Sequence, residues 1–326
     1  MKYIFSIFLV FVSLFLFGQC DNLPTIFPFD PIEREEANSI IAKCFAPTIN
    51  QMAERDDEHA LDGISDLILA VNYDGDWNTT NNWENLEDFE DVANMSSIDA
   101  LDPKVYYSVV WTDRAWVITY GFYHPRDWSL HTGLCCDNPT IGLPWIPETG
   151  DNHENDFEGV ILFVSRISTS NGIEPFEVFG AASIAHSELK TYSISNLPEV
   201  FVDNRSHAVE LNLEGLDCID YDSAANCDNC KYFFATDHIV YSPVDQDQEP
   251  FVTSDDNNDD DYLSGFGNYE LEDIFENSSE SLWSQRDNTD VFVGDIFARE
   301  DGTDCTEYGG DATAPWGWSQ FSYNNS

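Results

Sequence analysis

Short apolar runs separated by turn residues recur along most of the chain after residue 104, and they constrain the fold more than any other feature. Val105–Trp111 and Ala115–Tyr123 are rich in β-branched and aromatic residues and flank a short Thr-Asp-Arg turn, which predicts a hairpin. Because many short strands alternate with turns, we expect a mainly β fold, an antiparallel β-sandwich with peripheral helices and long loops. Further strands are predicted at Val160–Ile167, Phe176–Ile184, Val200–Val202, Ala208–Leu213, Lys231–Thr236, Ile239–Ser242 and Val291–Phe297.

The N-terminal hundred residues are predicted to be partly helical. Ile32–Glu54 has acidic residues in its first turn, where the helix dipole favours them, and Pro47 is expected to end or kink this helix. Asp57–Val71 carries apolar residues at helical spacing. Asp74–Ala100 is expected to be a long loop or helical excursion, and acidic Asp245–Asp261 a loop. The predicted divisions are a signal peptide at residues 1–18, an N-terminal extension with helices at 19–103, and a β-sandwich domain at 104–326.

The beginning of the chain resembles an export signal. One positive charge is followed by an unbroken apolar run, and small Gly18 precedes polar Gln19. This run is typical of a cleavable secretory signal and is short for a membrane span, and no later apolar run is long enough for one. We therefore expect a secreted protein that is cleaved after Gly18 and has no transmembrane segment in its mature chain. A lipid anchor on Cys20 is the minor alternative, because bulky Gln19 stands where a small residue is expected.

The chain has eight cysteines, which in an exported protein are expected to form disulfides. The number is even only when Cys20 is counted, which favours a bridge from Cys20, with Cys44 as a candidate partner, over acylation. The spacing of Cys227 and Cys230 could also seat zinc, but the chain has no second pair of this kind. The candidate disulfide residues are Cys20, Cys44, Cys135, Cys136, Cys218, Cys227, Cys230 and Cys305.

The charge balance excludes one large class of partners. The chain has 61 acidic and 13 basic residues, a formal net charge of −48. Affinity for nucleic acid needs lysine and arginine to displace counterions, so nonspecific binding to nucleic acid is excluded. The same charge opposes electrostatic docking to anionic lipid. Most of the carboxylates are best explained as a solubility feature.

A histidine and two carboxylates stand at the start of the apolar run Gly159–Val164. Asp156 and Glu158 are two residues apart, so on an extended backbone they share one face. His153 precedes them in a segment rich in Asn, Asp and Gly, and Asp127, at the end of the strand that contains Tyr120, could supply a third acidic ligand. This oxygen-rich donor set suits Mg²⁺, Mn²⁺ or Ca²⁺ better than a thiolate-binding metal.

These residues resemble a known family, the necrosis-inducing (necrosis- and ethylene-inducing-peptide-like) proteins. The family's hallmark is a Gly-His-Arg-His-Asp-Trp-Glu heptapeptide after a strand that ends in Tyr…Pro-Lys-Asp. This chain keeps its histidine and both acids as His153, Asp156 and Glu158, and the upstream acid as Asp127. It departs at Asn152, Glu154, Asn155 and Phe157, and about 25 residues separate Asp127 from His153 where the family has a short loop.

The resemblance implies a role for each of these residues. Asp127, His153, Asp156 and Glu158 would hold a divalent cation, directly or through water. His186 would lie behind them, although a histidine on an apolar strand is more often a hydrogen-bonded core residue. His207 and Tyr120 are further cavity or ligand candidates, and His124 is expected to be a loop residue.

Three functions follow, with the first preferred. The resemblance implies a secreted, divalent-metal-dependent protein that recognises a polar lipid headgroup or a glycan and damages membranes. The second is a metal-dependent hydrolase of phosphoester or glycosidic bonds with His186 as general base, although no nucleophile motif supports an enzyme. The third is a structural or adhesive surface protein in which the ion braces a loop.

Overall fold

The computed structural model describes residues 20, 23–53, 66–75, 77–79, 82, 103–127, 153–185, 188–203, 207–212, 239–243, 251–254, 263–276, 278, 281–288, 291, 315 and 322–325. The signal peptide, the strand expected at Lys231–Thr236 and nearly all of the strand expected at Val291–Phe297 lie outside these residues. So do His186 and every cysteine except Cys20 and Cys44. In the part of the chain that is described, no helix is long and apolar enough to cross a membrane.

The described strands form one mixed sheet of twelve, in the order β12-β6-β5-β4-β3-β2-β11-β9-β1-β7-β8, with β10 paired to β11. The mainly β prediction is confirmed, but the pairing is not wholly antiparallel: β1–β7, β2–β11, β9–β11 and β6–β12 are parallel. The bounds are β1 Ile49–Gln51, β2 Lys104–Trp111, β3 Ala115–Asp127, β4 His153–Ser165, β5 Val178–Ala185, β6 Glu188–Tyr192, β7 Glu199–Val202, β8 Val209–Asn212, β9 Ile239–Pro243, β10 Phe251–Ser254, β11 Leu263–Asp273 and β12 Ser322–Asn325.

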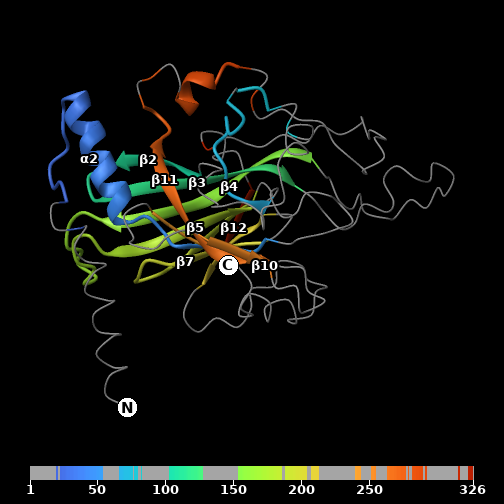
Figure 1. The fold of residues 1–326 in the computed structure, drawn as a ribbon. Helices are drawn as coiled ribbons and strands as arrows, with labels where there is room; N and C mark the ends of the chain where they lie inside the picture. The colour runs from blue at the N-terminus through green and yellow to red at the C-terminus, as the bar shows by residue number, and fades with distance from the viewer. Residues whose placement is uncertain are drawn as a thin grey trace, which may run out of the picture.

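Strand β11 joins the two halves of this sheet. Its residues Gly265–Tyr269 pair with β9, and its residues Glu270–Asp273 pair with β2. In Figure 1 it runs, in orange, from beside β10 to beside β2. The sheet is also curled, as shown by the contacts of β8 with β4 and β5, to which β8 is not hydrogen-bonded. The halves thus enclose a core between them, as in a sandwich.

The hairpin predicted from the sequence is present as β2 and β3, and β4 continues it. Every second residue of β3, including Trp116, Ile118 and Tyr120, is fully buried, and β4 contributes Val160 and Leu162 to the same core. Alternation of this kind places one face of each strand against the core. The long β3–β4 pair therefore forms a rigid platform whose far end carries the candidate site.

The N-terminal segment begins with helix α2, Pro31–Cys44, beside β2 (Figure 1). Asp30 caps it by accepting hydrogen bonds from the backbone N–H groups of Ile32 and Glu33 at 2.9 and 3.3 Å. The helix ends at Cys44, three residues before Pro47, the residue expected to end or kink it. The rest of the predicted range, to Glu54, is not helical where it is described, because residues 49–51 form the buried strand β1 between β9 and β7. The described part of the predicted extension thus shares the core of the β domain.

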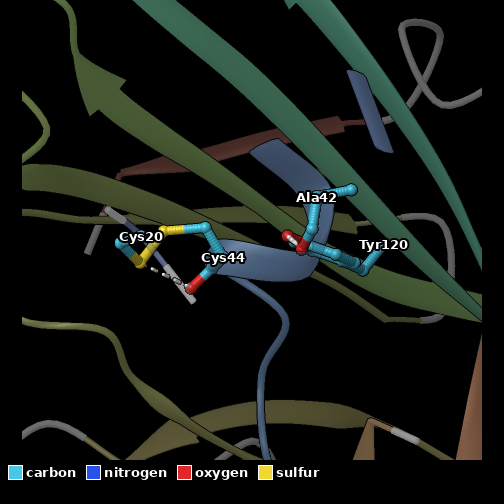
Figure 2. The surroundings of a disulfide bond; sticks show 4 residues. All are labelled: Cys20, Ala42, Cys44 and Tyr120. Carbon is cyan, nitrogen blue, oxygen red and sulfur yellow. Dashed lines mark hydrogen bonds between the residues drawn. A yellow bond between two sulfur atoms is a disulfide. The ribbon is translucent and has the colours of Figure 1, made fainter. Parts of the chain in front are cut away.

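A disulfide joins Cys20 to Cys44 at the end of α2, which confirms the pairing that the sequence suggested. Figure 2 shows this bridge near the hydrogen bond from the Tyr120 hydroxyl to the Ala42 carbonyl oxygen, 2.8 Å long. The bridge consumes the Cys20 thiol, so the minor alternative of a lipid anchor at that atom is not supported by this structure. Together these contacts hold α2 against the sheet.

Two further expectations are corrected. Phe251–Ser254, within the tract predicted as an acidic loop, forms strand β10 against β11. Leu67–Ala70, which lie in the second predicted helix, are buried but not helical, and the Leu69 N–H donates to the Tyr123 carbonyl oxygen at 3.0 Å. Burial against the edge of β3 overrides the helical spacing of these apolar side chains.

Candidate functional site

Polar side chains gather where β3 and β4 leave the core. His124 is the Cα partner of Asp156, and two residues further inward Phe122 is the Cα partner of Glu158. Cross-strand partners lie on the same face, so Asp156 and Glu158 share a face, as the sequence predicts. Both are buried, with relative exposures of 8% and 3%. Buried carboxylates need partners, because an isolated charge is costly to remove from water.

The β3–β4 ladder is interrupted between these residues and the ends of the two strands. Pro125 and Asn155 are missing from the ladder, although Arg126 pairs with Glu154 beyond them. Pro125 has no N–H to donate, and Asn155 has a φ of 65°, a left-handed conformation that Asn tolerates better than most residues. The Asn155 side chain is held by the Tyr123 hydroxyl at 2.6 Å and by Asn82 at 3.1 Å.

His207 lies between two carboxylates. It follows β7, has a φ of 50° and is fully buried. Its Nδ1 is 3.1 Å from Asp156 Oδ2, and its Nε2 is 3.3 Å from Asp66 Oδ1. Burial lowers the pKa of His207, but the hydrogen bonds to Asp156 and Asp66 outweigh it and raise the pKa to about 10. At neutral pH His207 is therefore an imidazolium that joins β4, the segment at Asp66 and the β7–β8 connection.

His124 stacks on His207, with ring centroids 3.9 Å apart and planes 5° apart. It is a fully buried strand residue, so the expectation of a loop residue is wrong. Burial, and then the charge of His207, lower its pKa well below the ordinary value, so His124 is neutral. The reason for the error is Pro125: the sequence -His-Pro- is typical of a turn, but here the proline occupies the irregular pair that needs no N–H.

The Gln51 side chain determines which nitrogen of His124 carries the proton. Gln51 Nε2 donates to the carbonyl oxygens of Met52 at 2.9 Å and Asp203 at 3.2 Å. Carbonyls only accept, so Gln51 Oε1 must be the atom that faces His124 Nε2, at 3.1 Å. His124 Nε2 therefore carries the proton, and Nδ1 keeps its lone pair. Nδ1 is buried and has no hydrogen-bond partner among the described residues.

His124, Asp156 and His207 each offer a metal-ligating atom, and these atoms lie within 4.8 Å of one another. The Asp156 side chain is 12% exposed, whereas that of His207 is fully buried. Neither His124 nor the supporting Asp66 and Gln51 was singled out from the sequence. The alternation of Tyr120, Phe122 and His124 on one apolar face is the signal that could have placed His124 in the interior.

The other predicted site residues are placed as follows. Asp127 and His153 are Cα partners at the end of the β3–β4 pair, and their side chains lie outside the described part. Their role as ligands, like that of Asp156 and Glu158, stays a prediction. Tyr120 is in the core, bonded to the Ala42 carbonyl oxygen.

No family model matches the chain. A comparison with curated proteins gives no match either. Solved structures do match: Necrosis and Ethylene inducing Protein 2, from the causal agent of cocoa's Witches Broom disease, has 15% identity and a TM-score of 0.27, covering 55% of this chain and 70% of its own. The chain is similar to the necrosis-inducing proteins. That is the family whose motif the sequence resembles.

Two other matches are shorter. A structure described as a toxin fold for microbial attack and plant defence has 17% identity and a TM-score of 0.22, over 33% of this chain and 45% of its own. NLPPya in complex with glucosamine has 16% identity and a TM-score of 0.22, over the same shares of 33% and 45%. This chain thus spans less than half of these two necrosis-inducing proteins.

Proposed function

We propose that this chain is a secreted binding protein of the necrosis-inducing type that uses a divalent cation to recognise a polar lipid headgroup or a glycan. The pairing of β3 with β4 carries the proposal. It sets Asp127 opposite His153 and puts Asp156 and Glu158 on one face at the same strand ends. The proposal takes all four potential ligands, which come from two separate segments, to hold one ion at the end of this pair of strands.

The chemistry of the donors fits a cation of this kind. Carboxylates are the usual protein ligands of Mg²⁺, Ca²⁺ and Mn²⁺, and these ions keep water or hydroxyl oxygens among their ligands. The bound ion would supply a positive charge that attracts the hydroxyl oxygens of a sugar. The partial exposure of the Asp156 side chain, 12%, supports access from solvent. NLPPya binds glucosamine, and for this chain a sugar-bearing ligand is part of the proposal.

Calorimetry with Ca²⁺, Mg²⁺ and Mn²⁺ tests the metal site. The wild type should give binding heats that are lost in Asp127→Asn and in Asp156→Asn. Asp113→Asn is the matched control, since it removes one exposed carboxylate from the β2–β3 turn, at the opposite end of β3. Near-ultraviolet circular dichroism would check that each variant folds. Equal heats for the wild type and both site variants would refute the proposal.

Dye release from vesicles tests the ligand class. Vesicles of phosphatidylcholine with and without a glycosylated sphingolipid would be exposed to the protein in the presence of a divalent cation or a chelator. Binding or release that needs both the sugar headgroup and the cation is the expected result. Equal behaviour of both vesicles would remove the sugar headgroup from the proposal.

A further inference from the structure

The most exposed large apolar side chains among the described residues come from one short stretch before and at the start of α2. Phe29 is 87% exposed, Ile26 78% and Ile32 77%, whereas every other large apolar side chain of the described surface is at most 54% exposed. Phe29 and Ile26 belong to residues 24–29, which we name the apolar loop and which border a groove of about 440 Å³ against α2. A contiguous group of exposed apolar side chains, unlike single ones, marks an interaction surface.

The fold holds the apolar loop in this exposed position. Its Phe27 ring packs edge-on against Trp111, with 5.6 Å between centroids, and against Phe29, with 5.7 Å between centroids. The Thr25 carbonyl oxygen accepts a hydrogen bond from the Arg166 guanidinium at 3.1 Å. The protruding side chains are therefore presented on a fixed backbone, so little ordering is needed before they bind.

Charges of both signs border the apolar loop. The Arg34 guanidinium lies over the Phe27 ring, 5.4 Å from its centroid. Arg114 is exposed in the β2–β3 turn, and its carbonyl oxygen accepts from the N–H of Arg166, which also holds the loop. The groove is edged by the carboxylates of Asp30, Glu33 and Glu36. A zwitterionic lipid headgroup offers a phosphate for the arginines and an ammonium for the carboxylates, so it matches this border.

A second copy of the chain is a poorer occupant of this surface. A stable protein–protein interface buries about 800 Å² on each partner. Even at the roughly 200 Å² that a large aromatic residue buries, three protruding side chains supply only about 600 Å². Two copies would also bring their acidic borders together. A lipid interface needs no matching surface, because apolar side chains enter it one by one.

We propose that the apolar loop inserts into the surface of a zwitterionic lipid bilayer, with Phe29 and Ile26 among the acyl chains and Arg34 and Arg114 at the phosphates. The net charge of −48 opposes an anionic surface. The loop lies beside the β2–β3 turn, whereas Asp127 ends β3. Figure 1 shows the blue segment before α2 on the other side of the molecule from that strand end. The inference thus goes beyond the proposed function, because this contact needs neither the cation nor the sugar.

Sedimentation with phosphatidylcholine vesicles, without sugar lipid and with a chelator, tests the contact in the intact protein with its disulfides oxidised. Lipid is varied from about 0.1 to 10 mM, since three side chains should bind less tightly than a myristoyl chain, with its constant of about 10⁴ M⁻¹. Phe29→Ser and Ile26→Ser should each lower the partition coefficient about tenfold. Leu197→Ser is the matched control, because Leu197 is also exposed, at 40%, but lies between β6 and β7. Absence of wild-type binding, or equal binding of Phe29→Ser, would overturn the proposal.

The lipid composition tests the assigned headgroup. Replacement of part of the phosphatidylcholine by phosphatidylserine should weaken binding, because the chain is strongly anionic. Arg34→Gln should weaken binding to pure phosphatidylcholine severalfold with the apolar side chains unchanged. Tighter binding to the vesicles that contain phosphatidylserine would overturn the assignment of a zwitterionic surface.

Two further readouts separate this inference from its alternatives. In sedimentation velocity without lipid, the wild type and Phe29→Ser should have the same oligomeric state, and a dimer that is lost in Phe29→Ser would replace the bilayer by a second copy. Dye release remains the readout of the proposed function. Release that needs the sugar and the cation, without binding to phosphatidylcholine in chelator, would keep the proposed function and refute this inference. Binding that needs Phe29, without sugar-dependent release, would do the reverse.

Discussion

The ring of His124 lies parallel to that of His207, 3.9 Å between centroids, so a neutral imidazole packs face to face on a charged one. Two carboxylates, Asp66 and Asp156, bind the charged ring, and the Gln51 amide binds the neutral ring. These five side chains come from five separate stretches of sequence. The cluster therefore contributes to the cohesion of the fold as well as to any ligand site.

Replacement of His207 by Asn should destabilise the protein by about 3–5 kcal/mol, because it leaves two buried carboxylates without their cation. Asn tolerates the left-handed backbone at this position, so the loss reflects the side chain. Urea denaturation measures it, and Asp113→Asn, on the surface, should change stability by no more than about 0.5 kcal/mol. Adding Asp66→Asn to His207→Asn should restore part of the stability. A loss below about 1 kcal/mol would contradict the assigned charge of His207.

Ionisation of the Asp273 carboxyl should lower the free energy of unfolding of the protein as the pH rises. Burial, and then the charges of Glu35 and Glu276, raise its pKa from 3.8 to about 6, although a hydrogen bond from the Phe275 N–H opposes this. A raised folded-state pKa contributes stability that is complete below about pH 4 and is lost as the pH passes through 6. Asp273→Asn, which keeps the bond to Phe275, should therefore match the wild type at pH 4 and exceed it at pH 8, by about 1 kcal/mol after allowance for solvent screening. Thermal unfolding from pH 4 to 8 measures this, and parallel curves for the two proteins would contradict it.

Gly121 should not tolerate a side chain. A Cβ atom there would collide with the ring of Phe157, on the strand paired with it. Overpacking of this kind costs about 1–3 kcal/mol, so Gly121→Ala should lower the free energy of unfolding by that amount. The matched control is Gly180→Ala in β5, where the nearest atoms would lie at an ordinary 3.4 Å. Gly121→Ala combined with Phe157→Leu should recover part of the loss; no recovery would mean that another contact is responsible.

Removal of the Cys20–Cys44 bridge should lower stability by about 3 kcal/mol in the chain-entropy estimate, since the two residues are 24 apart in sequence. The double variant Cys20→Ser, Cys44→Ser would be compared with the wild type in urea, with and without a reductant. The reductant should lower the stability of the wild type more than that of the variant. Mass spectrometry of tryptic peptides would identify the bridge directly, and a free or lipidated Cys20 would contradict it.

The sequence predicts strands well where apolar residues alternate over many positions. Val105–Trp111 and Ala115–Tyr123 correspond closely to β2 and β3, since their burial pattern is local. β11 was missed, because Gly265 and Gly267 weaken its strand pattern and only pairing with β9 and β2 stabilises it. β1 was missed for a related reason: three residues carry no periodicity of their own, and both of their neighbours in the sheet come from beyond residue 198.

The site was predictable only in part. Asp156 and Glu158 could be placed on one face from their spacing, which is a local property of a strand. The partners of His207 could not, because Asp66 lies 141 residues and Asp156 lies 51 residues away in sequence. Gln51 could not be assigned a role either, since its importance depends on hydrogen bonds to Met52 and Asp203 that exist only in the folded sheet.

The position of β1 between β7 and β9 has a consequence for the order of assembly. Residues 49–51 are synthesised early, but their antiparallel neighbour β9 ends at Pro243. Gln51 therefore stays without its final surroundings until most of the polypeptide has emerged, and contacts between such distant positions form slowly. Strand β1 is thus completed late in synthesis, and a truncated polypeptide that ends before β9 is expected to lack the antiparallel neighbour of residues 49–51.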